Sequence, residues 1–498
     1  MVKRRPLIFM IACFMTYGMI TCTTSLERSN FLEGEFWRKQ ALRDIIPYWY
    51  KHIHDKKYGG FHLALSREWE PISPRDKHPP MISRQVFGFS CAFLLSGDEK
   101  YLEVARQGVD YLLDHAWDKK YGGWFNTLTQ TGEPKDETKT VACQLYTDVG
   151  LALYYFVTGD DKALSHVLHS VNIRRRNAYD KQFGGYFQAL NRDLSVKDFS
   201  KGKHSHYGYT SSLLINLSMF TRDPEILSFA KELMQISMER MTDSEFGWLL
   251  GYPTAFDREW KYIPTVSNGR EIISAGAQLT GALASLRLYE LTGKETYREY
   301  GLSLGKQLIR FAWDSELGGW HNHIERIFPH SFVGPRKVSW WIQCYGNLLQ
   351  LHLYNITGDR QYLVHFEKMS AFWNKHFIDN QFGGIFQTVS FEGSPLEVNK
   401  AMPWRTSYHE MEHNFLNSLY LKLYKNHQSV KLHFLLKDTK ANSKHFVSPV
   451  EDPSVHIEAV QINGKPWEAF NPQERYVILP EGKNLKMEVT LEKNRQGK

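Results

Sequence analysis

Apolar residues recur along most of this chain at the spacing of α-helices. Between residues 31 and 425 they fall three or four positions apart in successive stretches, such as residues 141–156 and 163–171. A short turn, usually with Gly, separates the two members of a pair, because Gly adopts the positive φ that ends a helix and Asp or Thr caps the next one. The pattern therefore predicts helical hairpins, with turns at Ser96-Gly97-Asp98, Thr158-Gly159-Asp160, Thr221-Arg222-Asp223, Thr292-Gly293-Lys294 and Thr357-Gly358-Asp359.

A second signal separates one hairpin from the next: an Asp followed three residues later by an aromatic residue or Leu, and then by Gly. It occurs six times at intervals of 62 to 71 residues, which is typical of one supersecondary unit used repeatedly. We expect the Asp side chains to be structural, because each lies where a helix ends and loop N–H groups need an acceptor. The six copies start at Asp55, Asp118, Asp180, Asp243, Asp314 and Asp379.

Six hairpins predict twelve helices. The helices before the short turns are almost entirely apolar, whereas those after them carry Lys, Arg and Glu on one face, as inner and outer helices should. Because six pairs can close a ring, the sequence predicts an all-α fold, an (α/α)6 toroid over residues 31–425 whose long loops form a concave floor. The predicted helices are 31–54, 80–95, 99–116, 139–157, 161–178, 206–220, 224–241, 271–291, 295–312, 336–356, 360–377 and 405–425.

The N-terminus has the pattern of a targeting segment. Lys3, Arg4 and Arg5 precede an apolar stretch over residues 7–20, and Cys22 follows shortly after. We predict a signal peptide at residues 1–22, with either lipidation at Cys22 or ordinary cleavage. Either route exports the protein, as a periplasmic protein or an outer-membrane lipoprotein, and a lipid anchor is the one membrane contact expected.

From residue 429 onward apolar and polar residues alternate, as is typical of β-strands. Strands are predicted near residues 430–434, 455–462, 476–479 and 487–491, and Asn463-Gly464 is a hairpin signal. We predict that residues 429–498 form a small all-β appendage, and we expect it to cap the toroid rather than to bind carbohydrate.

Composition narrows the function. The formal net charge of +7 is modest for 498 residues, and no basic run is interleaved with aromatic residues, which disfavours nucleic-acid binding. The aromatic content of 14% suits a site in which rings stack on sugars. Cys91, Cys143 and Cys344 lie singly in predicted inner helices, and no Cys or His spacing typical of a metal site occurs. The sequence therefore predicts no metal and no cofactor.

Side chains near the N-terminal ends of the inner helices should point into one cavity. His exchanges a proton near neutral pH and Arg polarises a carbonyl group without titrating, so this set suits proton transfer on a sugar. Read in order, these ends give Arg84, Lys139, Gln144, Tyr146, His204, His206, Arg270, Glu271, Trp340, Trp341, Gln343, Trp404, Arg405, Tyr408, His409 and Glu412.

Motifs at these ends resemble those of the N-acylglucosamine 2-epimerase and cellobiose 2-epimerase superfamily. Arg84 stands in SRQVFGFS where the family has R-x-x-W-x-F-S, and His204 and His206 match its H-x-H pair. Residues 340–343 (WWIQ) match W-W-x-Q, and residues 404–409 (WRTSYH) match W-K-x-x-Y-H. The resemblance covers residues 31–425 and implies an (α/α)6 toroid that transfers a proton at C2 of a reducing sugar.

The catalytic set departs from the family pattern. A family G-H-x-x-E motif supplies one of two acid/base His residues, but here Ala277 and Thr280 occupy the His and Glu positions. Tyr345 and Glu412 likewise replace a family Glu and a family Arg. One proton-transfer partner is therefore missing, unless a group such as Glu271 or Tyr345 substitutes for it.

Aldose–ketose interconversion needs one base, whereas epimerisation needs a group on each face of C2. We therefore predict a sugar isomerase or epimerase that acts through an enediolate. The expected catalytic residues are His409 as base, Arg84 at the carbonyl oxygen and His206 for ring opening. The expected partner is a small-molecule mono- or oligosaccharide, bound by Tyr146, Glu271, Trp341, Gln343, Tyr345, Trp404 and Tyr408.

Two other classes remain open from the sequence. The same toroid hosts glycoside hydrolases and polysaccharide lyases, and hydrolysis needs two carboxylates across the site, for which Glu271 and Glu412 are the available pair. The third class is a carbohydrate-binding protein that keeps the aromatic floor and has lost catalysis.

Overall fold

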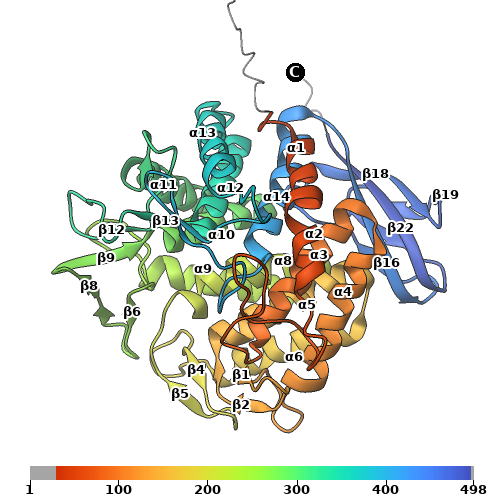
Figure 1. Cartoon of the computed structure of the whole chain (residues 1–498), viewed down its shortest axis with the longest axis horizontal. Helices are drawn as coiled ribbons and strands as arrows, with labels where there is room; N and C mark the ends of the chain where they lie inside the picture. The colour runs from red at the N-terminus through yellow and green to blue at the C-terminus, as the bar shows by residue number, and fades with distance from the viewer. Residues whose placement is uncertain (1–29, 495–498) are drawn as a thin grey trace, which may run out of the picture. The chain divides into compact units, whose positions relative to one another are not determined.

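The computed structural model describes residues 30–494, in which six inner and six outer helical segments alternate along the chain (Figure 1). The inner segments are α3 (Pro79–Ser96), α5 (Val141–Thr158), α7 (Tyr207–Tyr209) with η4 (Thr210–Leu214) and α8 (Ile215–Thr221), α10 (Ala275–Thr292), α12 (Trp340–Thr357), and α14 (Tyr408–Tyr420) with η5 (Leu421–Asn426). The outer segments are α1 (Gly34–Gln40) with η1 (Ala41–Ile45) and α2 (Ile46–His52), α4 (Glu99–Tyr111) with η2 (Leu112–Ala116), α6 (Asp161–Asn177), α9 (Pro224–Arg240), α11 (Glu295–Phe311) and α13 (Gln361–His376).

The ring closes because its first and last helices are in contact. The side-chain amide nitrogen of Gln40, the last residue of α1, donates a hydrogen bond to Asn374 of α13 at 2.6 Å. Lys422 of η5 forms an ion pair with Glu35 of α1 at 3.1 Å. Ser407, just before α14, donates to Gln85 of α3 at 2.5 Å. These contacts join segments more than 300 residues apart, so the predicted (α/α)6 toroid is confirmed.

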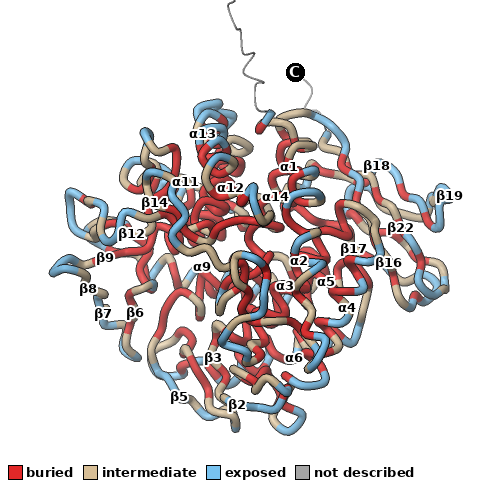
Figure 2. The backbone as a smooth tube through the Cα atoms, in the orientation of Figure 1, coloured by how far each residue is buried: buried red, intermediate tan, exposed pale blue. Residues whose placement is uncertain are grey.

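Burial separates the two rings of helices as the hydrophobic pattern predicts. Every residue of α10 from Ala275 to Leu286 is buried, whereas α4 and α11 each present one solvent-facing side. Buried backbone occupies the centre of the molecule in Figure 2, and exposed positions lie on outer helices and loops. Four of the short turns end their inner helices with a left-handed Gly, and Arg222 takes that position in the third turn with φ of 56°.

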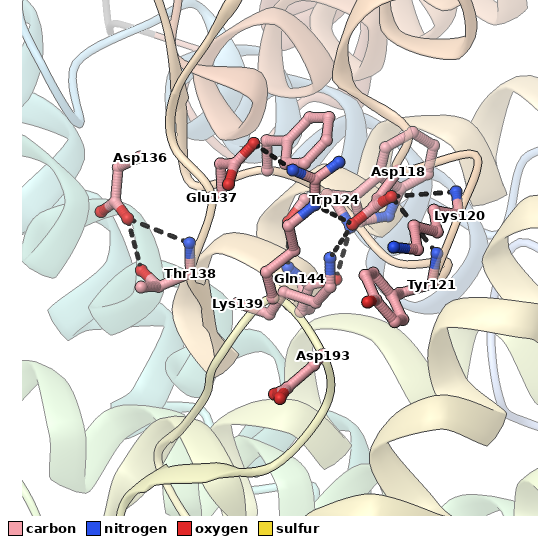
Figure 3. Close-up of polar contacts among 12 residues, drawn as sticks. Asp118, Lys120, Tyr121, Trp124, Asp136, Glu137, Thr138, Lys139, Gln144 and Asp193 are labelled. Carbon is pink, nitrogen blue, oxygen red and sulfur yellow. Dashed lines mark hydrogen bonds and ion pairs between the residues drawn. The ribbon is translucent and has the colours of Figure 1, made fainter.

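Each long loop is held by the Asp that begins the repeated phrase, as expected. Asp118 accepts the N–H groups of Lys120 and Tyr121 through one carboxylate oxygen, and its other oxygen lies 3.0 Å from the Lys139 ammonium (Figure 3). The same pairing recurs between Asp55 and Lys77, Asp180 and Lys201, and Asp379 and Lys400.

The long loops also form short antiparallel strands. The fourth and fifth inner helices therefore begin later than residues 271 and 336, where they were predicted to start. Residues 270–274 are strand β9 and residues 337–339 are strand β13, because each segment pairs with a neighbouring loop before its helix starts. The loop strands are β1 (Thr127–Leu128), β2 (Pro134–Asp136), β3 (Lys139–Thr140), β4 (Ala189–Leu190), β5 (Val196–Asp198), β6 (Ala255–Phe256), β7 (Tyr262–Ile263), β8 (Thr265–Ser267), β9 (Arg270–Ser274), β10 (Trp313–Asp314), β11 (Gly319–Trp320), β12 (His323–Glu325), β13 (Lys337–Ser339), β14 (Thr388–Ser390) and β15 (Pro395–Glu397).

The C-terminal segment forms the predicted β appendage. One sheet has the order β16 (Val430–Thr439), β22 (Gly482–Lys493), β18 (Val455–Ile462), β19 (Lys465–Pro466), and the other has the order β17 (Lys444–Phe446), β21 (Tyr476–Ile478), β20 (Phe470–Asn471). Ile462 pairs with Lys465 around Asn463-Gly464, both at positive φ, which confirms the predicted hairpin.

The appendage packs against the C-terminal ends of the inner helices. His445 lies 2.9 Å from the Phe156 carbonyl at the end of α5, and Lys437 pairs with Asp160 in the turn that follows. Glu451 contacts Arg287 of α10. These contacts make the appendage a cap on the end of the toroid away from the long loops.

The predicted signal peptide at residues 1–22, including Cys22, lies outside the described residues. Within residues 30–494, no helix is long and apolar enough to cross a membrane.

The contact between α3 and α5 depends on Gly150, where an added Cβ would lie 1.9 Å from the Ser83 carbonyl oxygen. We expect Gly150→Ala to lower the free energy of unfolding by about 1–3 kcal/mol, because the two helix backbones cannot separate without disturbing the core. The matched control is Gly305→Ala on α11, where the new Cβ would make an ordinary contact at 3.4 Å. This control should stabilise the helix by up to about 1 kcal/mol. Equal effects in denaturant unfolding would contradict the prediction.

Candidate active site

A cavity of about 220 Å³ opens at the loop end of the toroid. Its walls come from the first turns of inner helices and from the loops before them, so the tertiary fold gathers residues from all six repeats. We call it the loop-end cavity. The residues that line it are Arg84, Ala142, Tyr146, Lys203, His204, Tyr252, Trp340, Trp341, Tyr345, Trp404 and His409.

Arg84 of α3 is a buried cation without an acid partner among residues 30–494, since no carboxylate oxygen lies within 4 Å of its guanidinium. Its guanidinium carbon lies 3.9 Å from the centre of the Tyr146 ring and 5.2 Å from that of Tyr408. One nitrogen lies 3.4 Å from the Trp404 carbonyl, while its buried Nε has no hydrogen-bond partner. Arg84 is therefore able to bind an anionic or carbonyl oxygen in the cavity.

His409 stands in the first turn of α14 with its ring against Tyr345, at 5.3 Å between ring centres. Burial, together with the nearby charges of Arg84 and Lys203, holds the pKa of His409 well below its usual value. The imidazole is therefore neutral at pH 7 and can accept a proton.

Glu412, one turn after His409, supports that ring from behind. Its Oε2 lies 3.7 Å from Nδ1 of His409, and its Oε1 accepts a hydrogen bond from the Tyr408 hydroxyl at 3.2 Å. Burial raises the pKa of Glu412 to about 7. The two atoms are not hydrogen-bonded, and because burial raises the pKa of Glu412 and lowers that of His409, their contact is not a strong ion pair.

The structure brings most of the sequence-predicted residues together. Trp404 is 42% exposed at φ of 72° and places an accessible ring at the mouth of the cavity, while Tyr408 lies behind Arg84. Predicted residues that line the loop-end cavity are Arg84, Tyr146, Trp341, Tyr345, Trp404 and His409.

His206 and Gln343 do not line the cavity, which corrects their predicted placement. His206 is fully buried and accepts the backbone N–H of Tyr186 at 3.2 Å, and Gln343 accepts that of Trp320 at 2.8 Å. Tyr186 and Trp320 each end a copy of the repeated phrase. Gln144 and Gln278 accept the N–H groups of Trp124 and Leu249 in the same way, as Figure 3 shows for Gln144. These side chains satisfy buried loop backbone and are structural.

Glu271 is also misplaced in the sequence prediction. It lies on strand β9, where it pairs with Arg326 at 2.6 Å, and Arg326 in turn binds Asp243 at 2.7 Å. The side chain is held in the loops because residues 270–274 are a strand and not the start of α10. Glu271 and Glu412 therefore do not face each other across one cavity.

Sequence reasoning missed Lys203, Tyr252 and Ala142 as cavity residues. A signal for Lys203 exists in the spacing: Lys139, Lys201 and Lys400 each follow their Asp partner by 21 residues. The 21-residue spacing pairs Lys201 with Asp180. It therefore pairs no Asp of the repeated phrase with Lys203.

A group of possible metal ligands occurs elsewhere, in the core beneath the appendage. Side-chain atoms of Glu290, His352 and Glu451 lie within 4.8 Å of one another. However, Glu451 already contacts the Arg287 guanidinium and accepts from the Tyr420 hydroxyl at 2.8 Å, while Glu290 binds His352 at 2.8 Å. Arg287, which is mostly buried, supplies the compensating charge, so we interpret this group as an ion-pair network that fastens the appendage.

The chain belongs to the N-acylglucosamine 2-epimerase (GlcNAc 2-epimerase) family, whose model matches residues 59–412. It is 26% identical over 396 residues to a cellobiose 2-epimerase of Bacteroides fragilis, covering 75% of this chain and 95% of that protein. A cellobiose 2-epimerase of Ruminococcus albus is 22% identical over 390 residues, with 74% and 95% coverage.

Solved structures share the fold. A cellobiose 2-epimerase from Spirochaeta thermophila superposes with a TM-score of 0.70 at 22% identity, covering 78% of this chain and 96% of that one. A D-mannose isomerase gives 0.69 at 19% identity, with 79% and 98% coverage. A family 76 glycoside hydrolase from Bacteroides thetaiotaomicron gives 0.53 at 13% identity, with 79% and 99% coverage, so the fold alone does not separate isomerases from hydrolases.

A structural role for His206 can be separated from a catalytic one by substitution. We expect His206→Gln to keep activity within about threefold, because Gln provides the same acceptor in three other repeats. His206→Leu should lower the free energy of unfolding by about 1–3 kcal/mol, because it leaves the buried Tyr186 N–H without a partner. Denaturant unfolding and sugar turnover measure the two effects. Loss of turnover in a folded Gln variant would return His206 to the mechanism.

Proposed function

We propose that this protein is a sugar isomerase or epimerase that moves a proton at C2 of a free reducing sugar through an enediolate. The observation that carries the proposal is that one aromatic cavity holds both a neutral His409 and the Arg84 guanidinium, which has no acid partner among residues 30–494. A neutral imidazole can remove the C2 proton, and a fixed cation can stabilise the charge that develops on the carbonyl oxygen. The family relationship and the cellobiose 2-epimerase relatives support the same class of reaction.

The proposed reaction starts with the open-chain aldose, its C1 oxygen against Arg84 and its carbon chain across the aromatic floor. His409 takes the C2 proton, the C–H electron pair forms the C1–C2 double bond, and negative charge develops on the C1 oxygen. The O2 hydroxyl proton then passes to O1, and return of the first proton from His409 to C1 re-forms the carbonyl group at C2 and gives the ketose. This aldose–ketose interconversion needs one base and no external oxidant or reductant.

Ring opening requires a group near the sugar oxygens, and His206 lies outside the lining. His204 lines the cavity instead, with its ring 5.8 Å from that of Tyr146, centre to centre. Burial, with the charges of Lys203 and Arg84, lowers the pKa of His204 to about 3. We therefore assign ring opening to a neutral His204 acting as a proton acceptor.

Hydrolysis is less well supported by the same residues. Two carboxylates must flank the scissile bond, yet the described residues that line the cavity include no Asp or Glu. The remaining alternative is a carbohydrate-binding protein without catalysis. Such a protein would bind sugars through the aromatic rings alone, and His409 and Arg84 would then have no role.

The function is tested by incubating the protein with mono- and disaccharides in D₂O and following C2 by NMR. We expect deuterium at C2 and ketose formation, and we expect His409→Asn to reduce both by about 10²–10⁴-fold. The matched control is His413→Gln on the same helix, one turn farther from the cavity, where the imidazole contacts Asn347. This control should lower stability and keep exchange. If wild type exchanges no C2 hydrogen with any sugar, the proposed function is wrong.

We also propose that the chain is exported and anchored by a lipid at Cys22, on the basis of the basic and apolar pattern of residues 1–22. Expressed in a Gram-negative bacterium, the full chain should lose residues 1–21 and gain the mass of a lipid on Cys22. Cys22→Ser should move the protein from the membrane to the soluble fraction, since it removes the thiol to which the proposed lipid anchor is attached. Mass spectrometry that finds residues 1–22 intact on the wild-type protein would exclude both cleavage and the anchor.

A further inference from the structure

Lys203 is a buried cation that the mechanism above does not use. It lies in the short helix η3 (Lys203–Ser205), is 5% exposed and lines the loop-end cavity. Its ammonium nitrogen lies 5.2 Å from the ring centres of both Tyr252 and Trp341. No carboxylate oxygen within residues 30–494 lies within 4 Å of it.

The other buried lysines of the loops show how unusual this is. Lys77, Lys139, Lys201 and Lys400 are at most 1% exposed at their side chains, and each binds the Asp of its repeat at 2.7 to 3.1 Å. Burying an ammonium group without a partner is costly, because the charge loses its hydration. Within the described part of the chain, neither an Asp nor a hydrogen bond offsets that cost at Lys203, and the amine lines a cavity that can admit a ligand.

The position of Lys203 in the ring is the second observation. Lys203 immediately precedes the third inner helical segment, and His409 begins the sixth, so the two stand on opposite sides of a ring of six. Both approach the same aromatic side chain: the Trp341 ring centre lies 5.2 Å from the Lys203 nitrogen and 6.2 Å from the His409 ring centre. A sugar carbon held over Trp341 would therefore have one basic nitrogen on each side.

Trp341 also occupies the space beside the position of the missing family His. Its ring packs on the first turn of α10, where a Cβ added at Gly276 would lie 2.1 Å from a ring atom. Ala277, at the family His position, is fully buried and does not line the cavity. The start of α10 in the fourth repeat is thus covered by the Trp341 ring. The amine of Lys203, from the third repeat, lines the cavity instead.

We infer that Lys203 is a second catalytic residue, which exchanges a proton with C2 on the face opposite His409 and lets the enzyme form the C2 epimer. The inference rests on the proposed function and names a further group for it. In the epimerising direction His409 removes the C2 proton, and the Lys203 ammonium gives its proton to the other face of C2 as the C1 carbonyl re-forms. In the reverse direction the neutral amine is the base and the imidazolium is the acid, and solvent resets both groups.

The environment gives Lys203 the required acidity. Burial and, to a lesser degree, the charge of Arg84 lower the pKa of Lys203 to about 7. The amine is then present in both protonation states near neutral pH, as a group that must both give and take a proton requires. The titratable side chains that face it in the cavity are Arg84, Tyr146, His204, Tyr252, Tyr345 and His409.

The test compares wild type with Lys203→Arg and Lys203→Met in the D₂O assay, with ketose and C2 epimer quantified separately. Arg keeps the positive charge but holds its proton at all accessible pH values, so it isolates proton transfer from charge. We expect both variants to lose epimer formation by about 10²-fold or more, while Lys203→Arg retains ketose formation within about tenfold. The matched controls are Lys197→Arg and Lys197→Met at an exposed lysine six residues earlier. Both controls should behave as wild type.

The outcomes separate the inference from the proposed function. A wild type without C2 exchange refutes both. A wild type that forms ketose and no epimer, or a Lys203→Arg variant that still forms epimer at the wild-type rate, refutes the role of Lys203 and leaves His409 in place. Trapping of sugar on Lys203 by borohydride would also overturn the inference, since it would indicate a covalent imine. Circular dichroism of each variant confirms that it is folded, and Lys203→Arg decides the question if Lys203→Met is not.

Discussion

The Asp at the start of each long loop, buried in every repeat except the fifth, is the constraint on which the cavity depends. In four repeats it pairs with a buried Lys, and in the fourth and fifth repeats Arg326 and His321 take that place. The same carboxylates accept loop N–H groups, so one side chain fixes both backbone and neighbouring strand. Removing one partner of such a pair costs about 3–5 kcal/mol, and the cavity walls are accordingly held before any ligand binds.

The charged residues of the loop-end cavity differ from these paired loop residues. Arg84 and Lys203 are both buried cations without a carboxylate within 4 Å in residues 30–494, and His409 is neutral. A site with this balance favours a ligand that develops negative charge, as an enediolate does. Hydrogen bonds from a fixed cation strengthen as water is excluded, so the aromatic walls and the cations act together.

The β appendage completes the other end of the toroid. Glu451 of the appendage reaches Arg287 of α10 and Tyr420 of α14, and His445 binds the last turn of α5. These contacts cover helix ends whose carbonyl groups would otherwise face solvent. The two ends of the ring therefore differ: one is closed by packing and ion pairs, and the other bears the candidate active site.

Local patterns in the sequence predict the helical pairs, their number, the closure into six units and the β character of the tail. They do so because hydrophobic spacing and the left-handed turn at positions such as Gly159 are local properties. The sequence also locates Arg84 and His409, which lie at helix starts in recognisable motifs. Contacts between repeats set which of the other polar residues face the cavity. His206 and Glu271 occupy the same kind of position in the sequence as the cavity residues, but a loop N–H and Arg326 hold them elsewhere. Lys203 lies beside the cavity rings. The physical reason is that the orientation of a loop side chain depends on partners from other repeats, and periodicity along one chain does not encode those contacts.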